Sequence, residues 1–126
     1  MKRSILASLL AGCATALLLV VPALSQEDMT HVPTTGFKTT TRPAARFAHD
    51  AHNEKAKLDN CSVCHHGEKD GKRDPSGDST GTPCADCHAK PGRTPLMRAF
   101  HKQCMGCHLE QEKGPVTCGD CHTPAK

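Results

Sequence analysis

The sequence predicts one small domain that is mostly coil, with a few short α-helices, little or no sheet, and a bound cofactor in place of an apolar core. Three observations lead to this prediction. The chain has only 126 residues. Its aromatic residues are three Phe, with no Trp or Tyr, so an ordinary hydrophobic core cannot form. Nine Cys and nine His, residue types that bind cofactors and metals, occur in the same short chain. This composition excludes a conventional globular enzyme and leaves disorder, a disulfide scaffold or a fold wrapped around a cofactor.

The first element along the chain is an export signal. A short basic start at residues 2–3 precedes an uncharged apolar stretch, and small residues stand before Gln26. We therefore predict a secretory signal peptide at 1–25 and a mature domain at 26–126. A retained membrane anchor is the alternative, because about 20 apolar residues can span a bilayer. Cys13 also fits a lipoprotein signal, although the apolar run continues past it, and whether it is lipidated stays open.

Four copies of one motif then take up all eight cysteines of the mature domain. In each copy two residues separate a pair of Cys, and a His follows the second Cys. The copies are Cys61-Ser62-Val63-Cys64-His65, Cys84-Ala85-Asp86-Cys87-His88, Cys104-Met105-Gly106-Cys107-His108 and Cys118-Gly119-Asp120-Cys121-His122. This spacing is the attachment signature of c-type haem, because two such thiols can add to the vinyl groups of one porphyrin and the adjacent His can ligate its iron. Zinc sites or a disulfide framework are the alternatives, but neither explains a His after every pair. We predict four covalently attached c-type haems.

Second axial ligands for these irons are available among the remaining histidines, which are His31, His49, His52, His66 and His101. His49 and His52 are one helical turn apart and can reach two different haems. His66 directly follows His65, so its short tether directs it to a neighbouring iron. His101 lies on a short predicted helix. For each of them the alternative is a histidine that binds nothing, and His31, in a polar segment rich in Pro and Thr, stays unassigned.

This arrangement resembles class III cytochrome c, the small tetrahaem cytochromes of sulfate-reducing and related anaerobic bacteria. The resemblance covers residues 37–122. It is carried by the four motifs, Phe47-x-His49-x-x-His52, the Cys64-His65-His66 junction and Phe100-His101. It implies the axial pairs His49 with His65, His66 with His88, His52 with His108, and His101 with His122.

Two departures from the family pattern suggest a divergent subgroup, of the type that serves membrane-bound partners. Many members have four residues between the cysteines of the second and fourth motifs, whereas all four intervals here are two. His101 also precedes Cys104 by only three residues.

Regular structure is expected to be sparse outside the motifs. We predict short helices at 46–57 and 94–103, and one-turn helices at the haem motifs. The segment 67–83 is rich in Gly, Asp, Lys and Ser and predicts a solvated loop. Phe47 and Phe100, next to candidate ligands, are expected to stack on porphyrins.

Iron with imidazole on both sides has no open position for a substrate, which favours electron transfer over catalysis. We therefore predict a low-potential electron carrier that is not an enzyme. The alternative is a small multihaem reductase with one open haem site. The resemblance implies that a periplasmic hydrogenase or formate dehydrogenase donates electrons and that a transmembrane redox complex accepts them. We expect a periplasmic location, with membrane association only through such partners or an N-terminal tether, and no small-molecule substrate.

The formal charge of +3 does not indicate nucleic-acid binding. Loss of the signal peptide removes two basic residues, and each ferric haem c adds about −1, which leaves the oxidised protein near about −3. Basic side chains nevertheless concentrate in the last third of the chain, at Lys90, Arg93, Arg98, Lys102, Lys113 and Lys126. A solvated face is the alternative to the function we expect for them, a docking patch around the fourth haem.

Overall fold

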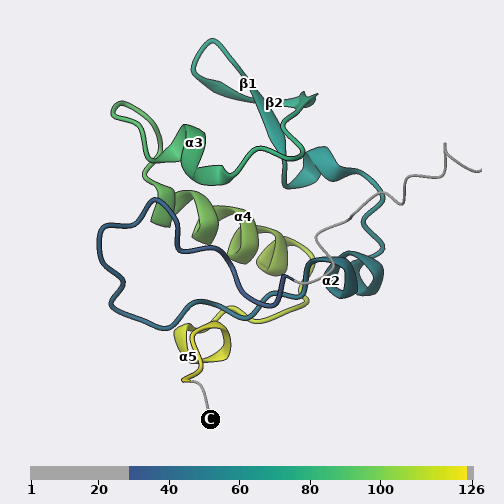
Figure 1. The fold of residues 1–126 in the computed structure, drawn as a ribbon. Coiled ribbons are helices and arrows are strands. Elements are labelled where there is room, and N and C mark those ends of the chain that lie inside the picture. The colour runs from purple at the N-terminus through teal and green to yellow at the C-terminus, as the bar shows by residue number, and fades with distance from the viewer. Residues whose placement is uncertain (1–28, 125–126) are drawn as a thin grey trace, which may run out of the picture.

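The computed structural model describes residues 29–124, so the signal peptide, Cys13 and Lys126 lie outside the described residues. The elements are α2 (His49–Ala56), a 3₁₀ turn η1 (Cys61–Val63), β1 (His66–Lys69), β2 (Lys72–Asp78), α3 (Cys84–His88), α4 (Leu96–Glu110) and α5 (Cys118–Cys121). The rest of this part is turns and coil that wind around α4 (Figure 1). The predicted fold class, mostly coil with a few short helices and little sheet, is confirmed.

Helix α4 is the longest element, with 15 residues, and lies at the centre of the molecule (Figure 1). It extends well beyond the predicted 94–103 because the third motif continues the helix. Residues 104–110 contain no Pro and a single Gly, so nothing interrupts the backbone hydrogen bonds before the turn that precedes Pro115. The other three motifs form the expected single turns, at η1, α3 and α5.

Helix α2 is shorter than the predicted 46–57 because its first residues are extended. Arg46 forms an isolated antiparallel bridge with His31. On either side of this bridge, Phe47 N donates to Thr30 O at 2.9 Å and Val32 N donates to Ala45 O at 2.8 Å. At the other end, Lys57 stops the helix in a left-handed conformation with φ 55°. The start of the described chain is thereby fixed beside the segment that leads into α2.

The prediction of a loop at 67–83 was wrong for most of that segment. Strands β1 and β2 form an antiparallel hairpin, in which Lys69 lies opposite Lys72. Asp70 and Gly71 connect them with φ values of 53° and 75°. Two residues with positive φ make the turn that best matches the twist of a hairpin, and Asp-Gly is among its preferred sequences. The strands lack alternating apolar residues, and their polar composition therefore concealed the hairpin.

The described residues have almost no apolar core. Leu96, 5% exposed, is their one buried hydrophobic side chain, whereas Met97 and Leu109 are 60% and 62% exposed. Burying one such side chain contributes about 1.5–3 kcal/mol, but ordering each residue costs about 1–2 kcal/mol. The polypeptide alone therefore cannot hold this fold, and an apolar bound group must take the place of a core.

A ring stack and a close backbone approach near Leu96 position the start of α4. Phe37 and Phe100 stack with ring centroids 6.3 Å apart. Gly36 has φ +94°, and a Cβ on it would lie 2.7 Å from the Cβ of Ala85 and 3.0 Å from Leu96 Cδ2. Only glycine fits this position, where the N-terminal coil crosses the junction of α3 and α4. Within residues 29–124 every helix is too short or too polar to span a bilayer.

Candidate functional site: four histidine pairs

The structure brings eight histidines together as four pairs of neighbouring rings, whose planes are tilted or edge-on to one another. Each pair joins one motif histidine to one histidine from elsewhere in the chain. The centroid separations are 6.3 Å for His49–His65, 6.0 Å for His66–His88, 6.2 Å for His52–His108 and 6.1 Å for His101–His122. These are the pairs that the family resemblance implies. His31 lies apart from them and contacts Thr30 Oγ1 through its Nδ1.

Local structure explains how neighbouring histidines reach different partners. His49 and His52 lie on the first turn of α2, and the Phe47 ring contacts both, at 5.9 and 5.0 Å between centroids. His65 closes the turn of the first motif, where its N–H donates to Cys61 O, and His66 is the first residue of β1. One helical turn and one change from turn to strand thus position four of the eight rings.

Hydrogen bonds at Nδ1 orient most of these rings. In five histidines Nδ1 lies 2.7–2.9 Å from a backbone carbonyl oxygen; the five are His66, His88, His101, His108 and His122. A carbonyl oxygen only accepts, so Nδ1 carries the proton and Nε2 keeps its lone pair. In His49 the Asp50 carboxylate plays the same part at 2.7 Å. This is the usual support of a metal-ligating histidine, which donates its second N–H to an oxygen and binds metal through the other nitrogen.

Gly114 leaves the space that the His108 ring occupies. Its φ is +86°, and a Cβ there would lie only 2.6–2.8 Å from three atoms of the His108 ring. The neighbouring carbonyl of Pro115 accepts the hydrogen bond from His108 Nδ1 at 2.7 Å. A larger residue at 114 would push the ring away from this carbonyl.

The pairs fit an iron ion held between two imidazoles. A metal–nitrogen bond to histidine is about 2 Å, so the two ligating nitrogens lie about 4 Å apart. The distance from each nitrogen to its ring centre accounts for the rest of the observed 6.0–6.3 Å. His52 Nδ1 is buried with no hydrogen-bond partner among the described residues, so this ring lacks the oxygen support seen at six of the others.

The eight motif cysteines are free thiols in the described structure. Burial of the sulfur raises the pKa of Cys104 to about 11, and the nearby Cys64 and Cys121 thiols add to the rise. Burial also raises the pKa values of Cys64, Cys84 and Cys121, so one thiol of each motif is affected. Cys104 interacts electrostatically with Cys64, Cys84 and Cys121, so it lies near thiols of the other three motifs.

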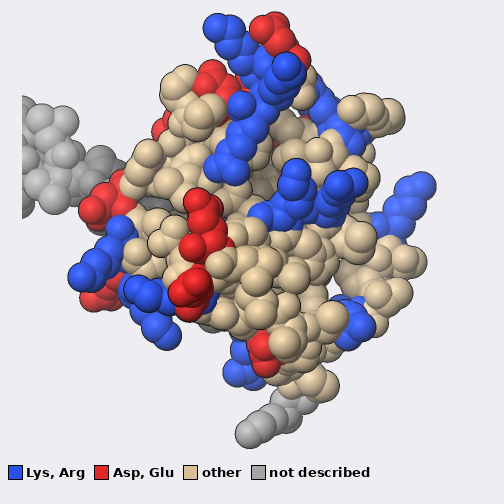
Figure 2. All heavy atoms as spheres, turned by 180° about the vertical axis from the view of Figure 1, so that it is seen from behind, with Lys and Arg blue, Asp and Glu red and all other residues tan. Residues whose placement is uncertain are grey.

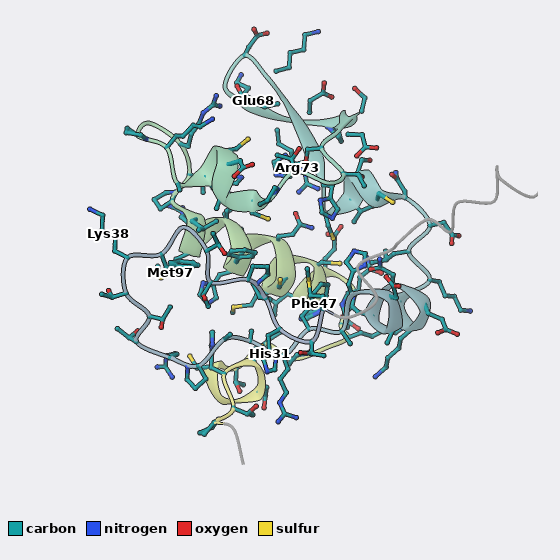
Figure 3. All side chains as sticks on the ribbon, viewed as in Figure 1. His31, Lys38, Phe47, Glu68, Arg73 and Met97 are labelled. Carbon is teal, nitrogen blue, oxygen red and sulfur yellow. The ribbon has the colours of Figure 1, made fainter. Side chains whose placement is uncertain are left out.

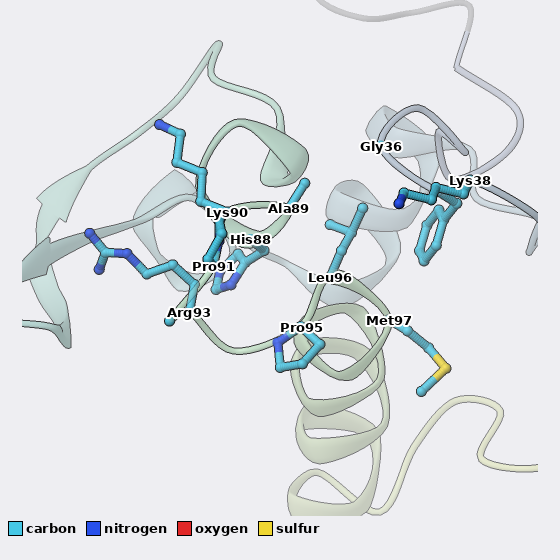
Figure 4. Close-up of a pocket in the computed structure, with 12 residues that line it drawn as sticks. Gly36, Lys38, His88, Ala89, Lys90, Pro91, Arg93, Pro95, Leu96 and Met97 are labelled. Carbon is cyan, nitrogen blue, oxygen red and sulfur yellow. The ribbon is translucent and has the colours of Figure 1, made fainter.

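A cavity of about 500 Å³ adjoins the second motif. The His88 ring forms part of its wall, together with Leu96 and the exposed Met97. Lys90 and Arg93 lie on one side of it and Lys38 on the other (Figure 4). Its apolar wall and histidine suit a haem edge, and the basic rim was only partly foreseen, because Lys38 lies 50 residues away from His88 along the chain.

Four Cys-x-x-Cys-His motifs, each with its histidine facing a second one, define a multihaem c-type cytochrome. Comparison with known sequences agrees: the profile of the class III cytochrome c family matches residues 25–122, and this chain belongs to that family. The prediction of the family is confirmed. Membership in it implies covalently bound haem c and a role in electron transport, so the zinc and disulfide alternatives no longer apply.

Individual relatives cover most of the chain. Cytochrome c3 of Desulfovibrio desulfuricans is 36% identical over 104 residues, which are 75% of this chain and 92% of the relative. Cytochrome c3 of Maridesulfovibrio salexigens is 38% identical over 111 residues, 79% of this chain and 95% of the relative. Cytochrome c7 of Geobacter metallireducens is 49% identical over 45 residues, 31% of this chain and 47% of the relative.

Proposed function

We propose that this protein is a periplasmic, low-potential electron carrier with four haems c, each ligated by two histidines. The observation that supports it best is the set of four ring pairs, all at 6.0–6.3 Å and all combining a motif histidine with another. We assign the attachment cysteines and axial ligands accordingly. They are Cys61, Cys64, His65 and His49 for the first haem; Cys84, Cys87, His88 and His66 for the second; Cys104, Cys107, His108 and His52 for the third; and Cys118, Cys121, His122 and His101 for the fourth.

Bound haem iron provides a one-electron centre that cycles between the ferric and ferrous states. The paired histidines would close both axial positions of a bound haem iron and leave no site for a substrate, which supports a carrier rather than the reductase alternative or any enzyme. The carbonyl bonds at Nδ1 hold the rings in place, so that ligation need not change with oxidation state. Seven of the eight rings are half-buried and His101 is exposed, and solvent access together with two imidazole ligands favours a low potential.

The proposed partners are a hydrogenase or formate dehydrogenase as electron donor and a membrane-bound redox complex as acceptor. Exposed basic side chains that would attract acidic partners lie on and just beyond α4, the helix that carries His101 of the fourth pair. Lys102 follows His101, Arg98 lies one turn earlier on α4, and Lys113 lies just beyond this helix. Lys and Arg gather over the upper and central part of the rear face, with Asp and Glu among and beside them (Figure 2). Arg93 contributes less to such a patch because it pairs with Glu68.

Haem number is tested by a pyridine haemochrome assay combined with the intact mass of the exported protein. We expect four haems per chain, a mass that shows cleavage before Gln26, and four reduction potentials below that of the standard hydrogen electrode. Fewer haems, or couples that are all positive, would contradict the proposal.

The docking patch is tested by reversing charge at Lys102 and Lys113 together. The second-order rate of reduction by a hydrogenase should fall and lose most of its salt dependence, because the steering charge is gone. Reversal at Lys55 and Lys57, exposed at the end of α2, changes net charge equally and is the control. Equal rates in the two double variants would remove the patch from the proposal.

A further inference from the structure

We propose that Arg73, held by Gln103, raises the reduction potential of the haem at the first motif relative to the other haems. The inference rests on the proposed electron-carrier function and extends it to residues outside the haem motifs. Both side chains meet the motif at Val63 and Cys64, directly before the ligand His65.

Three segments converge at this point. Arg73 comes from β2, Gln103 from α4 and Val63 from the first motif. Arg73 Nη2 donates to the Val63 carbonyl at 2.6 Å, and its Nη1 donates to Gln103 Oε1 at 3.2 Å. Gln103 Nε2 donates to the same carbonyl at 2.8 Å and lies 3.7 Å from Cys64 Sγ. Figure 3 shows Arg73 between the hairpin and α4.

The hairpin directs this arginine towards the motif. Arg73 lies opposite Glu68 in the strand register. The Glu68 carboxylate, however, accepts from Gly71 N at 3.0 Å and pairs with Arg93. Among residues 29–124 no carboxylate forms an ion pair with Arg73, and its guanidinium instead donates to Val63 O and Gln103 Oε1.

The charge is close enough to act on the attachment sulfur. Gln103 Nε2 lies 3.7 Å from Cys64 Sγ, and Arg73 Nη2 donates to the carbonyl of the preceding residue, Val63, at 2.6 Å. The positive ends of both groups therefore point at the place where a haem would be joined, and positive charge there favours the more negative, reduced state of that haem. Its hydrogen bonds to Val63 O and Gln103 Oε1 hold Arg73 beside the motif, where its positive charge would stabilise the ferrous state of a bound haem and raise its potential.

The arrangement is selective for one haem. Gln103 immediately precedes Cys104 of the third motif, but both donors point to the carbonyl of Val63 and to Cys64. We therefore expect the strongest effect at the first motif, a smaller effect at the third and little effect at the other two.

The test compares Arg73→Gln, Arg73→Lys and Lys72→Gln in the haem-loaded protein. Lys72 is the preceding residue on β2, whose side chain points to the opposite side of the strand, so its substitution removes the same charge elsewhere. Potentials are measured by NMR-monitored redox titration, which follows each haem separately. At a fixed applied potential we expect Arg73→Gln to lower the reduced fraction of the first haem severalfold relative to the other haems. Arg73→Lys should preserve most of it, and Lys72→Gln should change all haems slightly and alike.

Two results would overturn the inference. Equal shifts in Arg73→Gln and Lys72→Gln would mean that only net charge matters, and a loss in Arg73→Lys as large as in Arg73→Gln would mean a purely structural clamp. If Arg73→Gln does not accumulate, Gln103→Glu is measured in its place. A carboxylate beside Cys64 should lower the reduction potential of the haem at the first motif. An unchanged potential of that haem in Gln103→Glu would contradict the inference.

Failure of the inference is distinguishable from failure of the proposed function. Fewer than four haems, or a high-spin spectrum in the unsubstituted protein, would contradict the function itself. Four low-spin haems with potentials indifferent to Arg73 would contradict the inference alone.

Discussion

At the residue level, the orientation of the paired histidine rings depends on the oxygen atoms that accept hydrogen bonds from Nδ1. Carbonyl oxygens fix the protonated nitrogen of five rings, and Asp50 does so for His49. The sequence predicted these eight histidines as ligands, because a His follows every Cys pair and four of the five remaining histidines lie in a suitable context. It could not identify the carbonyls that accept these bonds, because Pro43 lies 79 residues from His122 and Pro115 reaches His108 only through the turn that follows α4.

Removing single distal ligands tests the pairs directly. We expect His52→Gly to open the third haem and His49→Gly to open the first, because these side chains leave one turn of α2 towards His108 and His65 respectively. Each variant should show one high-spin haem that binds one CO per chain when reduced. Difference spectra and haem-resolved NMR measure this.

The matched control is His31→Gly, which removes a histidine that lies outside the four pairs. All haems should remain low-spin in that variant. Opening of the same haem by His49→Gly and His52→Gly would show that the pairs are assigned incorrectly.

At the level of elements, helices were easier to predict than the hairpin. Both longer helices were expected from residue pattern, although α4 extends to Glu110 and α2 starts only at His49. The hairpin was missed because strands of Lys, Arg, Asp and Ser carry no hydrophobic alternation, and its stability comes from the Asp70-Gly71 turn and local hydrogen bonds. Its function as the support of Arg73 depends on this turn and could not be inferred without it.

Two aspartates of β2 make the hairpin sensitive to acid. Hydrogen bonds from the Ser76 hydroxyl and amide lower the pKa of Asp74, and those from Thr80 lower the pKa of Asp78. Since folding depresses both values, their favourable contribution is complete above the ordinary aspartate pKa of about 3.9. It disappears as pH falls through the lower, folded values.

Side-chain NMR titration measures this effect. Both carboxyl groups should titrate below the ordinary value in the native protein. We expect Ser76→Ala to raise the pKa of Asp74 and to leave the titration of Asp78 unchanged, while a Thr80→Val variant should do the converse. A uniform response of both aspartates to either substitution would argue against local hydrogen bonding as the cause.

At the level of the whole molecule, the haems take the place of a hydrophobic core. Low aromatic content predicted this, and the single buried hydrophobic side chain, Leu96, agrees with it in the described residues. The order of elements around α4 follows from where each motif must meet its distal histidine. Such long-range geometry depends on the cofactor and was accessible only through family resemblance.

Haem removal should therefore abolish the fold. Chain produced without haem attachment is expected to show little helical signal in far-UV circular dichroism, because burial of Leu96, worth about 1.5–3 kcal/mol, cannot offset ordering costs of about 1–2 kcal/mol per residue. The loaded protein should be helical and should melt cooperatively. A haem-free chain that keeps the helical signal of α4 and melts cooperatively would contradict the account.

The central claim is that histidine occupies both axial positions at four irons, and a visible spectrum of the reduced protein with and without CO tests it most directly. We expect four low-spin haems whose absorption bands do not move when CO is added. A CO-induced shift in the native protein, or a high-spin band in its oxidised form, would show an open iron and contradict the claim.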